Sequence, residues 1–130
     1  MGQSRPLRAT ALIVEDDPMQ REMICLLLEE SDYNVIQCES AEAAETVIEE
    51  VGGDLSLMMT DVNLAGRMTG VELAFIAKQH NPGLDVVVTS GRPLKQPLPD
   101  GAKFWPKPWA ALDVLREAEM AQTMANKAPQ

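Results

Sequence analysis

Four short apolar runs in this chain each end in polar or charged side chains, and this repeated arrangement constrains the fold more than any other feature. Short runs of this kind are typical of buried strands, and the segments between them carry apolar residues at helical spacing. The runs, with the polar residues that follow them, are Ala11-Leu12-Ile13-Val14 before Glu15-Asp16-Asp17, Leu57-Met58-Met59-Thr60 before Asp61, Val86-Val87-Val88 before Thr89-Ser90-Gly91, and Ala102-Lys103-Phe104-Trp105 before Lys107. Strands that alternate with helices predict an α/β fold with a parallel sheet.

The polar ends of these runs are expected to form a single pocket. In a parallel α/β sheet the C-terminal ends of the strands meet at one edge, and ligands bind there. That edge would gather the carboxylates of Glu15, Asp16 and Asp61, a hydroxyl from the third run and the ammonium of Lys107. Clustered carboxylates suit Mg²⁺, and a carboxylate can accept a phosphoryl group. The set therefore predicts a magnesium site beside an aspartate that becomes phosphorylated.

Composition is that of one ordinary globular domain. The chain has 130 residues, 45% of them hydrophobic, which is enough to bury a core. Its net charge of −9 argues against sequence-independent binding to nucleic acid. No apolar stretch is long enough to span a membrane, no signal peptide is evident, and Cys25 and Cys38 have no metal-site spacing. We expect a cytoplasmic chain with reduced cysteines, a single domain over residues 9–125 and flexible tails over residues 1–8 and 126–130.

The coarse secondary structure follows from periodicity and from helix start and stop signals. Met19, Met23, Leu26 and Leu27 recur at helical spacing and predict the packing face of the first helix. Ser40 is the expected N-cap of the second helix. Helices are expected over residues 18–30, 41–51, 70–79 and 109–125, and strands over residues 12–14, 35–36 with flanking positions, 57–60, 86–89 and 102–105.

Four sequence strings, in the order "ALIVEDDP", "LMMTDVNLAGRMTG", "VVVTSG" and "FWPKPW", resemble the receiver domain of two-component response regulators. The resemblance covers roughly residues 9–122. It implies a flavodoxin-like, doubly wound sheet of five parallel strands in the order 2-1-3-4-5. It also implies a phosphoacceptor aspartate, Mg²⁺ as cofactor, and a histidine kinase or histidine phosphotransfer protein as phosphoryl donor.

Carried over position by position, the resemblance makes Asp61 the phosphoacceptor. The metal ligands would be Asp16 directly, Glu15 through water, Asp61 itself and the backbone carbonyl of Asn63. Lys107 would pair with the Asp61 carboxylate and, after transfer, with the phosphoryl group. The family's peptide bond between this lysine and the following proline is cis.

The resemblance also implies a conformational switch. Its hydroxyl is Ser90, which precedes the small residue Gly91, with Thr89 as the fallback. Phe104 occupies the aromatic switch position, although a plain core role fits it nearly as well. Trp109 stands where the family usually has phenylalanine and is expected to anchor the last helix.

One stretch departs from the family pattern. A typical receiver has a full helix between its fourth and fifth strands, but residues 92–101, "RPLKQPLPDG", contain three prolines and no apolar stripe. Proline removes a backbone donor and clashes with the preceding turn. We therefore expect the fourth helix of the family to be short or absent here, and the output surface to be atypical.

The function implied is that of a stand-alone response regulator in a phosphorelay, which signals to a downstream protein by contact and is not a conventional enzyme. Alternatives are a degenerate receiver that binds partners without phosphorylation and a small phosphohydrolase with an aspartate nucleophile. A phosphohydrolase with Asp61 or Asp16 as nucleophile would need an acid/base aspartate two residues later. This chain has Asn63 and Pro18 at those positions. A flavodoxin-like cofactor binder would need a phosphate loop where this chain has the acidic "EDDP".

Overall fold

The sheet consists of five parallel strands, each a short segment with an apolar centre. The computed structural model describes residues 8–126, and the predicted tails lie outside this range except for Arg8 and Asn126 at their edges. The strand order is β2-β1-β3-β4-β5, which confirms the predicted α/β, flavodoxin-like class. The strands are β1 (Thr10–Val14), β2 (Asn34–Cys38), β3 (Leu57–Asp61), β4 (Asp85–Ser90) and β5 (Lys103–Pro106).

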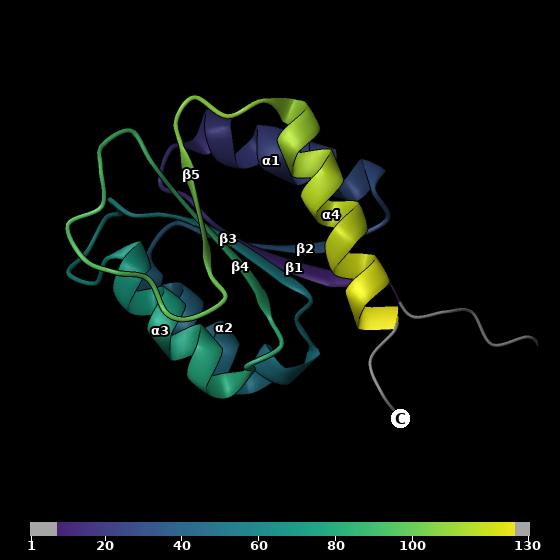
Figure 1. The fold of residues 1–130 in the computed structure, drawn as a ribbon, viewed down its shortest axis with the longest axis horizontal. Helices are drawn as coiled ribbons and strands as arrows, with labels where there is room; N and C mark the ends of the chain where they lie inside the picture. Colours follow the sequence, from purple (N-terminus) through teal and green to yellow (C-terminus); the bar gives the residue numbers. More distant parts are fainter. Residues whose placement is uncertain (1–7, 127–130) are drawn as a thin grey trace, which may run out of the picture.

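Helices cover both faces of this sheet. Helices α1 and α4 lie over one face, and α2 and α3 lie over the other (Figure 1). The helices are α1 (Pro18–Glu30), α2 (Ala41–Val51), α3 (Gly70–His80) and α4 (Ala111–Asn126), with a short 3-10 turn, η1 (Gly52–Asp54), after α2. Within the described range, no helix has the length and apolar character needed to cross a membrane.

Side-chain caps fix where the first three helices begin. Asp17 accepts a hydrogen bond from the backbone N–H of Met19, and Ser40, as predicted, caps α2. Thr69 and Glu72 form a reciprocal capping box at the start of α3. Each cap satisfies N–H groups that have no partner within the helix. The helices therefore start close to the strand ends, which keeps the polar residues of those ends at the sheet edge.

The central strands are buried on both sides, as their continuous apolar runs predict. Alternate residues of β1, β3 and β4 enter two cores, one under α2 and α3 and one under α1 and α4. Cys25 and Cys38 are both buried and free. Trp109 packs against the α1/α4 core, in agreement with its expected anchoring role.

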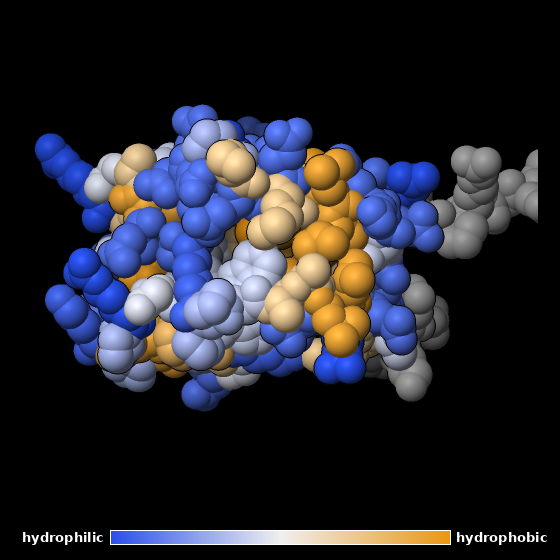
Figure 2. Space-filling view, turned by 90° about the horizontal axis from the view of Figure 1, so that it is seen from above, coloured by the Kyte–Doolittle hydropathy of each residue, from blue (hydrophilic) through white to orange (hydrophobic). Residues whose placement is uncertain are grey.

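The predicted packing face of α1 is wrong in part. Met19, Met23 and Leu26 are 82%, 47% and 55% exposed, and the helix instead buries Ile24, Cys25 and Leu28. This helix carries apolar residues on more than one stripe, and periodicity alone does not select the stripe that meets the sheet. The consequence is an apolar band on the α1/α4 side of the molecule, visible among hydrophilic residues in Figure 2.

No helix lies between β4 and β5. Residues 92–101, hereafter the strap, form bends and turns, as their prolines predict. Leu98 anchors the strap on the α2/α3 core, and the N–H of Ala102 donates to the carbonyl of Pro99. The last helix begins at Ala111, two residues after the predicted start.

A partly buried ion cluster lies at the start of β4 and β5, where the sheet packs against α4. Lys103 Nζ contacts Glu117 Oε2 and lies 3.8 Å from Asp85 Oδ1. Asp85 Oδ2 is buried without a hydrogen-bond partner among the described residues. Burial first, and then the neighbouring Glu117 carboxyl, raise the pKa of Asp85 from 3.8 to about 7.

This raised pKa predicts that the fold loses stability as pH rises. The native state keeps a proton on Asp85 that the unfolded chain releases above pH 3.8. The free energy of unfolding therefore falls as pH rises from 3.8, and the fall is complete above about pH 7. Between pH 5 and pH 8 the free energy of unfolding should fall by roughly 2–3 kcal/mol, because each pKa unit between pH 5 and the folded-state pKa of about 7 corresponds to about 1.4 kcal/mol. Urea denaturation across this range tests it. Asp85→Asn should flatten the profile, exposed Asp54→Asn should not, and equal slopes in the two variants would contradict the assignment.

Candidate active site

Three carboxylates meet at the C-terminal edge of β1 and β3. Glu15 and Asp16 follow β1 directly, and Asp61 ends β3, the strand paired with β1. One carboxylate oxygen from each of the three residues lies within 4.8 Å of the others. The structure thus brings together the acidic residues that the sequence assigned to one pocket.

Lys107 reaches this cluster from the segment after β5. Its Nζ lies 3.0 Å from Asp61 Oδ2 and 3.7 Å from Glu15 Oε1, and it also donates to Gln20 Oε1 at 3.1 Å. Burial lowers the pKa of Lys107, but the hydrogen bond to Asp61 and the charges of Asp61, Glu15 and Asp16 outweigh it, so the pKa is raised overall. Lys107 is therefore a fixed ammonium held against Asp61. The peptide bond between Lys107 and Pro108 is cis, as predicted.

Glu15 is the buried member of the acidic group, with 3% of its surface exposed. Its N–H donates to the carbonyl of Cys38 on β2, and its Oε2 accepts from the N–H of Asp17. Burial raises the pKa of the Glu15 carboxyl, the hydrogen bond from Asp17 opposes the shift, and the charge of Asp61 adds to it. Three carboxylates so close together repel one another, and a cation beside them would relieve that repulsion.

The residues present fit Mg²⁺. Three carboxylates offer hard oxygen ligands, and Mg²⁺ prefers such ligands while keeping several waters. The backbone carbonyl of Asn63 stays a predicted further ligand. No His or Cys belongs to the cluster, so its donor set does not resemble a zinc site. Lys107, with its Nζ on Asp61 Oδ2, already neutralises part of the charge on the side facing β5.

Two residues of the first turn of α1 belong to the site although sequence reasoning did not select them. Gln20 joins Lys107 to Asp17, because its Nε2 donates to Asp17 Oδ2 while its Oε1 accepts from Lys107. Arg21 donates from its guanidinium to the backbone carbonyl of Glu15 at 2.8 Å. The available signal was spacing, since residues three and four positions after an N-cap lie on the same face as the cap. Asp17 itself serves as the cap of α1.

The predicted switch residues lie beside the acidic cluster. Ser90 is 3% exposed and its Oγ accepts from the N–H of Arg92, while its carbonyl accepts from the N–H of Lys107. Thr89 is also buried and pairs in register with Asp61. Phe104 is half-buried on β5 opposite Val88. Ser90 as the switch hydroxyl, Thr89 as its fallback and the role of Phe104 stay predictions.

Close packing positions the loop between β3 and α3. A Cβ built on Gly70 would lie 1.9 Å from the carbonyl oxygen of Asp61, and the Gly70 N–H donates to the carbonyl of Val62. Farther out, Glu42 of α2 accepts from the N–H groups of Arg67 and Met68, and these two hydrogen bonds lower its pKa. The loop that follows Asp61 is thus tied down at both ends.

The sequence of this chain matches a known protein family and part of a much longer curated relative. The family model described as "Response regulator receiver domain" matches residues 11–99, more than half of the chain. A curated relative from Thermotoga maritima, named a cyclic di-GMP phosphodiesterase, is 41% identical over 81 residues, which are 62% of this chain and 21% of the relative. The chain thus spans about a fifth of that relative's length.

Two solved structures illustrate the structural likeness. The receiver domain of the hybrid histidine kinase CckA is 26% identical with a TM-score of 0.76, and the match covers 87% of this chain and 98% of that one. A CheY-like receiver domain protein from Methanospirillum hungatei JF-1 has a TM-score of 0.79 at 23% identity, covering 94% of this chain and 100% of that one. At the latter identity the likeness speaks for the fold alone.

Proposed function

Because the chain belongs to the response regulator receiver domain family, we propose that it accepts a phosphoryl group on Asp61 from a histidine kinase or a histidine phosphotransfer protein. The observation that carries the proposal is the position of Asp61, whose Oδ2 lies 3.0 Å from Lys107 Nζ while its carboxylate shares a cluster with Glu15 and Asp16. A carboxylate held between a fixed cation and a magnesium site is equipped to attack phosphorus and form an acyl phosphate.

In the proposed reaction Asp61 is the nucleophile, and its neighbours bind the metal and balance charge. An oxygen of Asp61 forms a bond to phosphorus as the bond between phosphorus and the donor atom breaks. Glu15, Asp16, Asp61 and the Asn63 carbonyl would hold Mg²⁺, which would supply positive charge against the transferring group. Lys107 pairs with the Asp61 carboxylate before transfer and with a phosphoryl oxygen afterwards. The hydrogen bond from Lys107 to Gln20 restricts the position of the ammonium group.

The proposed output runs from Ser90 to the strap. A phosphoryl group on Asp61 adds charge and acceptor oxygens, which favour a new hydrogen bond from the Ser90 hydroxyl. Ser90 accepts a hydrogen bond from the N–H of Arg92, the first residue of the strap. A shift of the Ser90 hydroxyl would therefore break this hydrogen bond or move the strap backbone. Phe104, the partner of Val88 on β5, is the proposed second element of the switch.

Signalling by protein–protein contact suits the surface. Most of the described large apolar side chains that are exposed lie on α1 and α4, Figure 2 shows a hydrophobic band on one face of the molecule, and exposed apolar patches commonly mark protein contacts. The net charge of −9 disfavours nucleic acid as the partner. The activity named for the Thermotoga maritima relative belongs to a much longer protein, and Asn63 replaces the acid/base aspartate that a phosphohydrolase with Asp61 as nucleophile would use.

The test is covalent labelling with a small phosphodonor. After incubation with acetyl phosphate and Mg²⁺, intact-mass spectrometry should show one added phosphoryl group, and peptide mapping should place it on Asp61. Asp61→Asn should abolish the label, and Asp54→Asn, an exposed carboxylate in η1, should retain it. A label in Asp61→Asn that maps to serine or threonine would contradict the assignment. A wild-type chain that binds Mg²⁺ but takes no label would favour a phosphorylation-independent binding module.

A further inference from the structure

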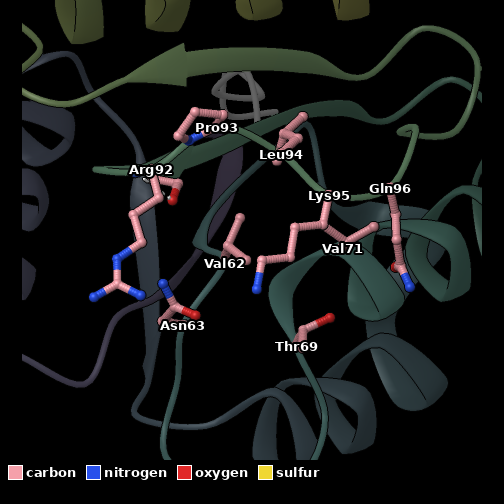
Figure 3. Close-up of a pocket in the computed structure, with 10 residues that line it drawn as sticks. Val62, Asn63, Thr69, Val71, Arg92, Pro93, Leu94, Lys95 and Gln96 are labelled. Atoms are coloured by element: carbon pink, nitrogen blue, oxygen red, sulfur yellow. Dashed lines mark hydrogen bonds between the residues drawn. The ribbon is translucent and has the colours of Figure 1, made fainter.

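A hollow of about 260 Å³ lies between the strap and the loop that follows Asp61. We call it the strap pocket. Figure 3 shows the strap side chains above it and the loop residues below. Its lining residues are Val62, Asn63, Thr69, Val71, Ser90, Arg92, Pro93, Leu94, Lys95 and Gln96.

The charge of the strap pocket is opposite to that of the chain. The whole chain carries a net charge of −9, yet the lining holds two cationic side chains and no carboxylate. Within residues 8–126, neither the Arg92 guanidinium nor the Lys95 ammonium makes a hydrogen bond or an ion pair. Both side chains reach from the strap toward the loop, on the side where Asn63 lies (Figure 3). Both side chains are exposed to solvent, so an anion placed between them would replace water around two cations and would not have to break an ion pair.

The rest of the lining is amphipathic. Val62, Val71 and Leu94 offer apolar surface, and Thr69 and Ser90 bring hydroxyl groups. Each of these hydroxyl oxygens already accepts a backbone N–H, from Glu72 and Arg92 respectively, so its own O–H is available to donate. Apolar walls with a few polar groups are typical of small-molecule sites, and this volume suits a ligand of modest size.

The strap pocket exists because the strap is not a helix. Pro93 lines the pocket and, with the two later prolines of the strap, excludes a regular helix over the β4 end. The strap instead crosses the sheet edge as a series of bends and turns, held by Leu98 on the core. The side chains of Arg92 and Lys95 therefore extend toward the loop after Asp61 (Figure 3).

We propose that the strap pocket binds a small organic phosphate. Its dianionic head would lie between Arg92 and Lys95, and its short apolar body against Val62, Val71 and Leu94. Two cations on separate stems, together with hydroxyl donors, match a head with three acceptor oxygens better than a single carboxylate, which one arginine can satisfy alone.

The position of the strap pocket gives such a ligand access to the phosphoacceptor site. Ser90 and Asn63 line the pocket, and the same two residues are assigned to the switch and to the metal site beside Asp61. The ligand therefore alters the rate at which Asp61 is phosphorylated, and this second statement rests on the proposed function. Binding itself does not, so the two are measured separately.

Binding is tested with phenylphosphonate, which has a dianionic head and an apolar ring but no transferable phosphoryl group. The titration is followed by ¹⁵N NMR without Mg²⁺, so that the three carboxylates repel the probe from the phosphoacceptor site. The backbone amides of Val62, Thr69 and Leu94 should shift together and saturate. Arg92→Gln and Lys95→Gln should each weaken binding about tenfold, since a hydrogen bond to a charged group contributes about one such factor.

Controls separate the pocket from general charge effects. Arg116→Gln removes an exposed cation of α4 with the same change in net charge and should leave the affinity unchanged. Asp61→Asn should still bind, which keeps this result independent of phosphorylation. Equal weakening by Arg116→Gln, or shifts that follow Lys107 and not Leu94, would overturn the proposed site.

The effect on phosphorylation is then measured in the same variants. Saturating phenylphosphonate should change the initial rate of Asp61 labelling by acetyl phosphate at least about twofold in the wild type and leave Arg92→Gln/Lys95→Gln unaffected, because this variant no longer binds the probe. A probe that binds without changing the rate would overturn the coupling and leave the binding site standing.

Discussion

Replacing Gly70 by alanine is expected to destabilise the fold by about 3 kcal/mol and to disturb Asp61. A Cβ at this position would lie 1.9 Å from the Asp61 carbonyl oxygen and 2.9 Å from Thr60 Oγ1, distances that real contacts do not reach. Gly70 does not adopt a positive φ, so the difficulty is space and not backbone conformation. The first turn of α3 or the end of β3 must shift, and overpacking of this kind typically costs about 1–3 kcal/mol, with more where backbone is involved.

Chemical denaturation of Gly70→Ala beside Gly53→Ala measures this effect. Gly53 has nothing within 4 Å of a built Cβ, so alanine there should be close to neutral. Gly70→Ala should also slow the labelling of Asp61 by acetyl phosphate when compared at a temperature where both variants are folded. If both variants unfold at the same denaturant concentration, the tight approach of Gly70 to β3 is not a constraint on the fold.

Much of this fold was predictable because its strands are short, apolar and separated by well-marked helix starts. The polar residues Glu15, Asp61 and Lys107 were recognisable because each follows such a strand, and parallel strands bring their ends together. Proline content sufficed to predict that the strap is not a helix, since three prolines spread over ten residues remove backbone donors and clash with the preceding turns wherever a helix interior would lie.

Other features depend on tertiary packing that a linear pattern does not encode. The apolar residues of α1 lie on overlapping stripes, and only contact with the sheet selects Ile24 and Leu28 over Met19 and Met23. Nothing in the sequence marks Gly70, at the predicted start of a helix, as a position that requires glycine. Its requirement arises from the backbone of Asp61, which the chain brings next to it only in the folded state.

Side-chain networks that join different helices and strands were also not predictable from the sequence. Gln20 became part of the site because Lys107, 87 residues away, reaches it from beyond β5. The strap pocket likewise needs two segments, the loop after β3 and the strap after β4, which adjacent parallel strands place side by side. Neither segment alone carries a recognisable ligand motif, so the pocket had no signal in the sequence.

Asp16→Asn is expected to reduce Mg²⁺-dependent phosphorylation of Asp61 by about 100-fold or more while leaving the fold intact. Asp16 is exposed, and it contributes an oxygen to the cluster within 4.8 Å of those of Glu15 and Asp61. Losing this carboxylate removes a proposed direct ligand of the cation that neutralises the incoming phosphoryl group, and the loss of one such electrostatic contact commonly costs about 100-fold or more in rate. Without the cation the remaining carboxylates repel the donor.

The same substitution should not lower thermal stability, and this combination is what distinguishes a metal ligand from a structural residue. The Asp16 side chain is exposed, and its charge adds to the repulsion between Glu15 and Asp61. Melting without Mg²⁺ should therefore occur at the same or a higher temperature than in the wild type, and added Mg²⁺ should raise it less. Asp54→Asn, an exposed carboxylate outside the cluster, should match the wild type in labelling and in its response to Mg²⁺. Wild-type labelling kinetics in Asp16→Asn would remove Asp16 from the proposed metal site, and a large fall in melting temperature would instead assign it a structural role.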